Sequence, residues 1–152
     1  MAKGIQAEVN NLILKLQSIS DTARKDSRMA FSEGAKPLIA AIKAAAPVSQ
    51  GPHIGRGPGG VNVLYKPGNL RRSFRKLLFR RSSAVFVGPK VDFVGGASAN
   101  GYYAHFVEFG TVNQAPQPFV RPVAATIGPV ALRISAVELK RMIEIHAKRL
   151  SV

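Results

Sequence analysis

A stretch of 57 residues, from 35 to 91, contains eleven lysines and arginines and no aspartate or glutamate. It supplies most of the net charge of +14 carried by the 152-residue chain. Because an unpaired charge is costly to bury, these side chains must lie at a surface or meet carboxylates from elsewhere. The pattern therefore predicts an anionic partner, which is a nucleic acid, a membrane surface or an acidic protein.

The composition predicts a single folded domain over residues 1–152. With 46% hydrophobic residues, the chain has enough apolar surface for one modest core. It has no cysteine, which excludes disulfide scaffolds, thiolate zinc sites and cysteine nucleophiles. No apolar run approaches the roughly 20 residues of a membrane span, so we expect no membrane partner. The first residues lack the apolar core of a signal peptide, which predicts a cytosolic product.

Helices are predicted near the N-terminus, at about 5–46. Apolar residues recur at three- and four-residue steps from 5 to 17, which predicts a first short helix. Serines interrupt the pattern, and Ser20-Asp21 is a plausible cap for a second helix that runs to about Ala46. Pro37 removes a backbone donor inside that helix, so we expect a kink there.

The insert 49–69 is predicted to be irregular. Seven of the ten residues from 51 to 60 are glycine or proline, which leaves little local structure to offset the loss of chain entropy. A connection of this length is uncommon inside a compact domain. We therefore expect a neighbouring molecule to hold this insert.

A sheet region is predicted at 70–111. A helical turn at 69–73 leads into a strand at about 74–81, and the chain returns at 84–88 as its hairpin partner. A helical alternative stays open for the first strand, because its apolar residues also fit a period of 3.6.

The C-terminal part is predicted to be one helical region at about 119–150, interrupted at Gly128-Pro129. We expect it to pack on the sheet, which gives an α+β domain. The residues expected on its apolar side are Val130, Ile134, Val137, Met142 and Ile145.

The residues that carry acid–base or metal chemistry are few. His105 and Glu108 stand three apart, a spacing found in helical metal sites, but a zinc site needs three or four ligands and no second cluster is visible. No G-x-S-x-G motif is present. We predict no enzymatic activity and no cofactor. A hydrolase that uses His105 and Glu108 is the enzyme hypothesis to be tested.

A basic run at 71–81 is the best candidate for contact with nucleic acid, because two phenylalanines are interleaved with its cations. The favoured interpretation is that the phenylalanines face the core and the cations line a solvated or subunit-facing surface. Alternation along the strand predicts one face on the helices and the other at a subunit contact. The candidate interface residues are Arg75, Lys76, Arg80, Arg81, His53 and Arg56.

Three short blocks follow one another along the chain. The first is Ala44–Val48, continued after the insert by Gly68–Ser73; the second is Tyr102–Thr111; the third is Gln117–Pro122. Together they resemble the small tail-component family encoded in the head-to-tail gene block of long-tailed, HK-type lambdoid bacteriophages. The resemblance spans about 5–150 and departs from the family at the insert. The motif residues given a structural role are Gly68, Asn69, Leu70, Arg71, Arg72, Ser73, Tyr103, Ala104, Phe106, Glu108, Phe109, Gly110, Thr111, Pro118, Phe119, Arg121 and Pro122.

The resemblance implies a structural virion protein of the phage neck. It implies a ring of sixfold symmetry between the head connector and the tail tube, assembled in the host cytoplasm. The partners would be further copies of the chain, a head-completion or connector protein, a tail-terminator or tail-tube protein, and packaged DNA in the lumen. The alternatives are a terminator ring that caps the tail tube and, from charge alone, a basic nucleic-acid-binding module.

The chemistry of the blocks predicts their packing. We expect the aromatic residues from Tyr102 to Phe109 to form a small core, and Gly110 to permit a tight exit. We expect Glu108 to pair with Arg71 or Arg72, because it is one of only four acids after residue 34.

Overall fold

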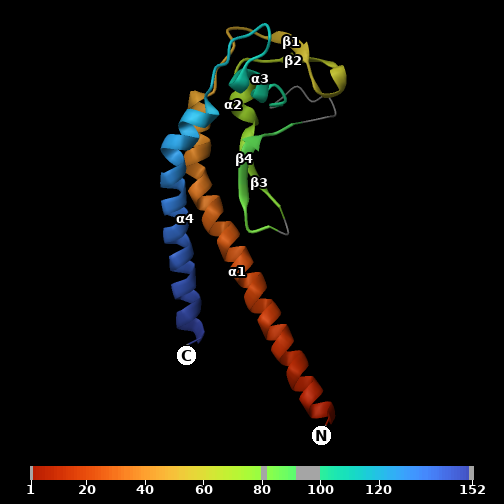
Figure 1. Ribbon diagram of the computed structural model, residues 1–152, viewed down its shortest axis with the longest axis vertical. Coiled ribbons are helices and arrows are strands. Elements are labelled where there is room, and N and C mark those ends of the chain that lie inside the picture. The colour runs from red at the N-terminus through yellow and green to blue at the C-terminus, as the bar shows by residue number, and fades with distance from the viewer. Residues whose placement is uncertain (1, 80–81, 92–99, 151–152) are drawn as a thin grey trace.

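The computed structural model describes residues 2–79, 82–91 and 100–150 (Figure 1). Two long helices lie side by side and run in opposite directions, and two β-hairpins and two short helices fill the connection between them. The predicted α+β class is confirmed. The elements are α1 (Ala2–Ala45), β1 (His53–Arg56), the 3₁₀ turn η1 (Pro58–Gly60), β2 (Asn62–Tyr65), α2 (Asn69–Ser73), β3 (Phe74–Leu78), β4 (Val85–Pro89), α3 (Ala104–Phe109) and α4 (Val120–Leu150).

The N-terminal region is a single helix, so the prediction of two helices is wrong. The hydroxyl of Ser18 donates to the carbonyl of Lys15 at 2.8 Å, and the hydroxyl of Thr22 donates to the carbonyl of Ser18 at 2.8 Å. These side chains bond back to their own helix instead of diverting the backbone. Helix α1 therefore continues past Ser18 and through Pro37.

Helix α4 is also continuous, and the predicted interruption at Gly128-Pro129 is wrong. Packing against α1 stabilises the helix on both sides of Pro129, and tertiary contacts of this kind commonly outweigh local propensity.

The packing of α4 on α1 uses small residues. Gly34 of α1 lies so close to α4 that an added Cβ would overlap the side chain of Ser135 and the carbonyl of Ala131. Met142 is buried as predicted. The expected apolar side is otherwise wrong, because the other large residues are at least one-third exposed: Val130, Ile134, Val137 and Ile145.

The main hydrophobic core lies where α1 ends and α4 begins. The rings of Phe74 in β3 and Phe119, just before α4, meet edge to face with centroids 5.6 Å apart. The buried members of this core are Ile42, Ala46, Leu70, Phe74, Ala104 and Phe119.

The insert forms a β-hairpin, so the prediction that it is irregular is wrong. That a neighbouring molecule holds the insert stays a prediction. Strands β1 and β2 pair antiparallel from His53 with Tyr65 to Arg56 with Asn62. Val63 and Tyr65 are 5% and 1% exposed, and they anchor the hairpin to its own chain. The glycines of the tip supply the turn, since Gly59 and Gly60 have positive φ angles.

The second hairpin confirms the predicted sheet. Strands β3 and β4 pair antiparallel from Phe74 with Pro89 to Leu78 with Val85, and α2 occupies the predicted helical turn. The helical alternative for β3 is therefore wrong. Strand β3 ends at Leu78, and the remainder of the predicted strand includes Arg80 and Arg81, which lie outside the described residues.

Helix α4 has a stretch whose length and apolar composition are those of a membrane-spanning helix. Of the described residues, Val120–Lys148 is long and apolar enough to cross a membrane by length and composition alone, with a mean hydropathy of 1.3. The expectation that no segment approaches such a span is wrong for this helix. The same helix lies along α1, and 11% of its apolar stretch is buried within the described structure.

Candidate functional site

Glu108 connects the second and third sequence blocks. One carboxylate oxygen accepts the backbone N–H groups of Phe119 at 2.8 Å and Val120 at 2.9 Å, and the other accepts the N–H of Arg121 at 3.0 Å. The first N–H groups of a helix have no partners within the helix. The side chain of Glu108 is 6% exposed, so it caps α4 from the interior of the protein.

The ionised form of the Glu108 carboxyl is stabilised by its surroundings at the start of α4. Burial raises the pKa of the Glu108 carboxyl, but the N–H donors of Val120, Phe119 and Arg121 lower it, and the nearby guanidinium of Arg121 lowers it further. The net effect places the pKa below its ordinary value. The carboxylate is thus ionised at neutral pH and interacts favourably with the positive end of the helix dipole.

The predicted pairing of Glu108 with Arg71 or Arg72 is wrong. The guanidinium that approaches Glu108 is that of Arg121, with its Nε 3.7 Å from the carboxylate. Arg72 instead donates to the carbonyl of Pro67 at 3.1 Å, and both Arg71 and Arg72 are exposed. An acid and several arginines are visible in the sequence, but only the tertiary fold brings the start of α4 to the carboxylate of Glu108.

Asn69 connects the first block to the second. Its side-chain amide donates to the carbonyl of Asn100, and its side-chain oxygen accepts the N–H of Asn100 at 3.3 Å. Asn100 in turn accepts the N–H of Tyr102 at 3.1 Å. Both asparagines are fully buried, so their hydrogen bonds fix the start of the second block against α2.

Asn100 was missed by the sequence analysis. The available signal was the pair Asn100-Gly101, which is typical of a turn. Gly101 is required here because an added Cβ would overlap the side chains of Ser73 and Pro89.

The second block packs through only part of its aromatic set. Tyr103 lies edge to face on Tyr65 with centroids 4.7 Å apart, but Phe106 and Phe109 are 40% and 63% exposed, which corrects the expectation of a four-residue core. The guanidinium of Arg121 lies over the exposed ring of Phe109 at 4.3 Å. Gly110 leaves the helix at a φ of 77°, as predicted for a tight exit.

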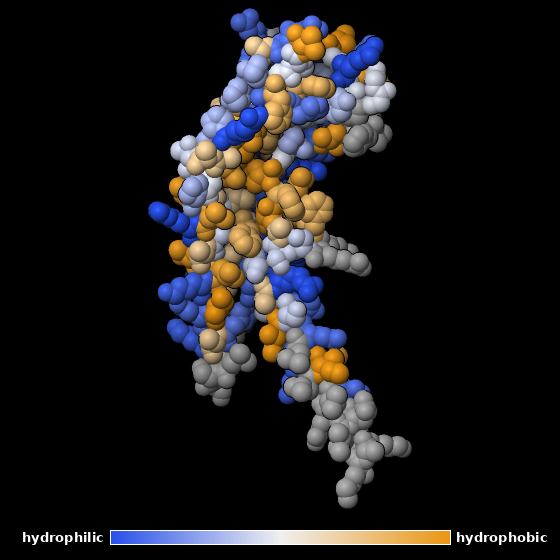
Figure 2. All heavy atoms as spheres, viewed as in Figure 1, coloured by the Kyte–Doolittle hydropathy of each residue, from blue (hydrophilic) through white to orange (hydrophobic). Residues whose placement is uncertain are grey.

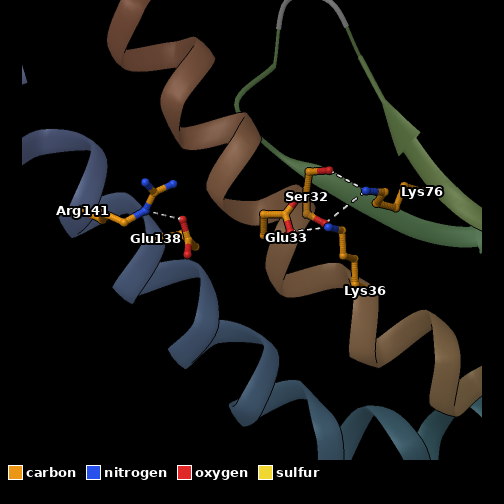
Figure 3. Close-up of polar contacts among 6 residues, drawn as sticks. All are labelled: Ser32, Glu33, Lys36, Lys76, Glu138 and Arg141. Carbon is orange, nitrogen blue, oxygen red and sulfur yellow. Dashed lines mark hydrogen bonds and ion pairs between the residues drawn. The ribbon is translucent and has the colours of Figure 1, made fainter. Parts of the chain in front are cut away.

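The candidate interface residues on β3 have different roles. The ammonium of Lys76 donates to the hydroxyl of Ser32 at 2.6 Å and to its carbonyl at 3.3 Å, which ties β3 to α1 (Figure 3). Arg75 points to the exposed side of the strand. Lys76 therefore faces α1 and Arg75 faces outward, which is the predicted division of β3 into a helix-facing side and an outer side. Lys76 stabilises the contact between β3 and α1 within the chain.

The outer face of the β3–β4 hairpin carries exposed aromatic rings. Phe79 and Phe86 meet edge to face at 5.4 Å, and each is more than half exposed. Phe74 faces the core as predicted, whereas the same prediction for Phe79 is wrong. Exposed paired rings beside Arg75 give this face the composition of an interaction surface.

The candidate residues of the first hairpin lie on β1. The exposed ring of His53 packs beside the contacting pair of Tyr65 and Tyr103, with centroids 5.7 Å from Tyr65 and 6.4 Å from Tyr103. Arg56 is exposed at the other end of the strand.

Glu108 is used as a helix cap, while His105 is exposed and packs against the ring of Phe106 at 3.8 Å. Within the described ranges, no group of three or more histidine, aspartate and glutamate side chains could hold a metal ion.

These buried polar groups bind backbone and one another, and so they hold the sequence blocks together. Comparison with known families gives a match over residues 10–110 to the model described as "Bacteriophage HK97-gp10, putative tail-component". The chain belongs to this phage tail-component family. The matched region includes the first block and the second block except its last residue, and it ends before the third block, so it is shorter than the predicted resemblance. No curated protein and no solved structure matches the chain.

Proposed function

We propose that this chain is a structural protein of the phage neck, where copies form a ring that joins the head connector to the tail tube. The observation that carries the proposal is membership of the phage tail-component family over residues 10–110. The buried links made by Asn69 and Glu108 support it, because they hold three separate sequence blocks in one rigid unit.

The surface of the molecule is suited to such a ring. A closed head-to-tail ring needs two different surfaces on each copy. One candidate is the outer face of the β3–β4 hairpin, with Arg75, Phe79 and Phe86. The cations of 35–91 would then face either acidic neighbours or the DNA that passes through the lumen.

The proposal is tested by removing the protein from the phage that encodes it, with a nonsense mutation in its gene. We expect filled heads and tails of normal length to accumulate unjoined, and the wild-type chain supplied in trans to restore joining. Joined, infectious particles without the protein would contradict the neck role. A terminator ring gives a third result, because uncapped tail tubes would grow beyond their normal length.

A nucleic-acid-binding module is the second candidate, favoured by the absence of carboxylates from 35–91. An isolated binder of this kind would show a steep decrease in DNA affinity as salt is raised. We expect weak binding for a neck protein, because its cations act in the assembled ring.

A further inference from the structure

The fold concentrates unbalanced positive charge at one end of the molecule. Strands β1 and β2 and helices α2 and α3 lie together there, and the two long helices extend away from them (Figure 1). We call residues 46–73 and 100–119 the hairpin end. Its one carboxylate is that of Glu108, which is buried, and its four lysines and arginines are all exposed: Arg56, Lys66, Arg71 and Arg72. Strongly hydrophilic side chains project from this end in Figure 2.

Three of these cations belong to one short segment, Lys66–Arg72, which we call the basic turn. The N–H of Asn69 donates to the carbonyl of Lys66 at 3.0 Å, and the N–H of Arg72 donates to the carbonyl of Gly68 at 3.0 Å. The guanidinium of Arg72 donates to the carbonyl of Pro67 at 3.1 Å. The backbone of the turn is therefore held by its own hydrogen bonds, and it presents Lys66, Arg71 and Arg72 at the surface.

The cations of the basic turn have no carboxylate to neutralise them within the chain. Among the residues that the structure describes, none of the ion pairs includes Lys66, Arg71 or Arg72. The turn is also free of other work in the core, because its buried contacts come from Asn69 and Leu70. The three side chains are thus available to an anionic partner.

A second copy of the chain is a poor source of that negative charge. Each acid whose side chain the structure describes already contacts a basic side chain of its own copy, and the acids are Asp21, Asp26, Glu33, Glu108, Glu138 and Glu144. An acid that moved to the basic turn of a neighbour would leave its own partner unpaired. The exchange neutralises no net charge, so the partner is a different, anionic molecule.

The surface composition of the basic turn favours nucleic acid over an acidic protein. No large apolar side chain is exposed from residue 65 to residue 77, since Tyr65, Leu70 and Phe74 are all buried. Protein–protein interfaces have an apolar centre and few lysines. Interfaces with DNA are more polar and much more positively charged, and most of their hydrogen bonds go to phosphate and sugar.

We propose that the basic turn binds the phosphate backbone of double-stranded DNA without regard to base sequence. The inference rests on the proposed function in one respect, which is that DNA passing through the neck is the nucleic acid within reach. It orients each copy with its hairpin end toward the lumen. Contacts that are weak in one copy add together when several copies surround the same duplex.

The test compares two variants of the full chain that lose the same charge at different places. One carries Lys66→Gln and Arg71→Gln in the basic turn. The other carries Lys25→Gln and Arg133→Gln, at exposed positions of α1 and α4. The affinity of each chain for a fluorescently labelled duplex of mixed sequence is measured by anisotropy over a series of salt concentrations. The series begins at low ionic strength, because an isolated copy binds weakly.

We expect the basic-turn variant to lose affinity and to show a shallower dependence on salt. The slope of log affinity against log salt should fall by about two, because each lost phosphate contact removes about 0.9 from it. The α1 and α4 variant should keep the slope of wild type. Arg71→Gln alone should give a decrease of about one. Melting temperatures equal to that of wild type would verify that these exposed substitutions leave the fold intact.

Three results would overturn the proposal. An unchanged slope in the basic-turn variant would show that the turn does not contact phosphate. Equal decreases in both double variants would assign binding to the overall charge of the chain. Displacement of the duplex by polyglutamate at an equal concentration of charge would assign the turn to an acidic protein.

The DNA contact and the neck role can fail separately. Heads and tails that join normally without the protein would reject the neck role, whatever the slopes of the variants. Unjoined particles in that experiment, together with an unchanged slope for Lys66→Gln with Arg71→Gln, would reject the DNA contact alone.

Discussion

The carboxylate of Glu108 in α3 lies 2.8 Å from the backbone nitrogen of Phe119, the residue before α4. The start of α4 is thus capped by a side chain from a different helix, α3, which lies eleven residues earlier in the sequence. Gln117 adds to this connection, because its N–H donates to the carbonyl of Val107 at 2.8 Å. The direction in which α4 leaves the core is set by these contacts.

Removal of the carboxylate should destabilise the protein. Glu108→Ala leaves three N–H groups of the α4 start without their acceptor, and we expect a loss of about 3 kcal/mol in the free energy of unfolding. Glu108→Gln should lose less, because the amide retains one acceptor oxygen. Denaturant unfolding of both variants measures the effect. The matched control is Glu144→Gln on the exposed part of α4, for which we expect a change under about 0.5 kcal/mol.

The contribution of Glu108 should depend on pH. Its pKa is lower in the folded protein than in the unfolded chain, so its stabilisation is fully present above the ordinary glutamate value of about 4.3 and is lost as the pH falls through the folded-state pKa. The difference in melting temperature between wild type and Glu108→Gln should therefore be large at pH 7 and shrink in acid. A difference that stays constant from pH 7 to pH 3 would show that the charge is not the cause.

Gly34 should tolerate no side chain. A Cβ there would overlap Ser135 and Ala131, so Gly34→Ala must separate α1 from α4 and should cost about 1–3 kcal/mol despite the better helix propensity of alanine. Gly128→Ala is the matched control, because nothing lies within 4 Å of its added Cβ. That variant should be neutral or stabilising by up to about 1 kcal/mol. Equal melting temperatures for the two variants would contradict the close packing of these helices.

Substitutions of the neighbouring residues Arg75 and Lys76 in β3 should have different effects, one on assembly and the other on stability. Lys76→Met removes the contact with Ser32, so we expect a loss of about 1 kcal/mol in the free energy of unfolding. The variant should therefore melt at a lower temperature than wild type. Arg75→Glu on the outer face should melt like wild type but reduce the number of joined particles. If Arg75→Glu supports normal joining, the outer face of β3 and β4 is not an interface.

The sequence is sufficient for the elements whose signals are local. Alternating side chains and the turn between them predicted the pairing of β3 with β4, and Gly110 was predicted to leave its helix in a conformation that glycine favours. The single long α1 was missed because a serine inside a helix and a serine that ends one look alike until the acceptor of the hydroxyl is known.

The remaining errors concern long-range contacts. The high content of glycine and proline concealed the β1–β2 hairpin, although Val63 and Tyr65 alternate with exposed residues on β2. The motif residue Glu108 was identified, but its acceptor role was not, because its partners are N–H groups of a helix terminus rather than side chains. Backbone groups have no sequence signal of their own.

An image of the assembled phage neck, with its symmetry determined, shows directly whether this chain forms the ring between head and tail. We predict a closed sixfold ring of this chain between the head connector and the tail tube, with the folded unit held together through Asn69 and Glu108. A particle in which the chain lies at the distal end of the tail, or in which the connector meets the tube without it, would contradict the account.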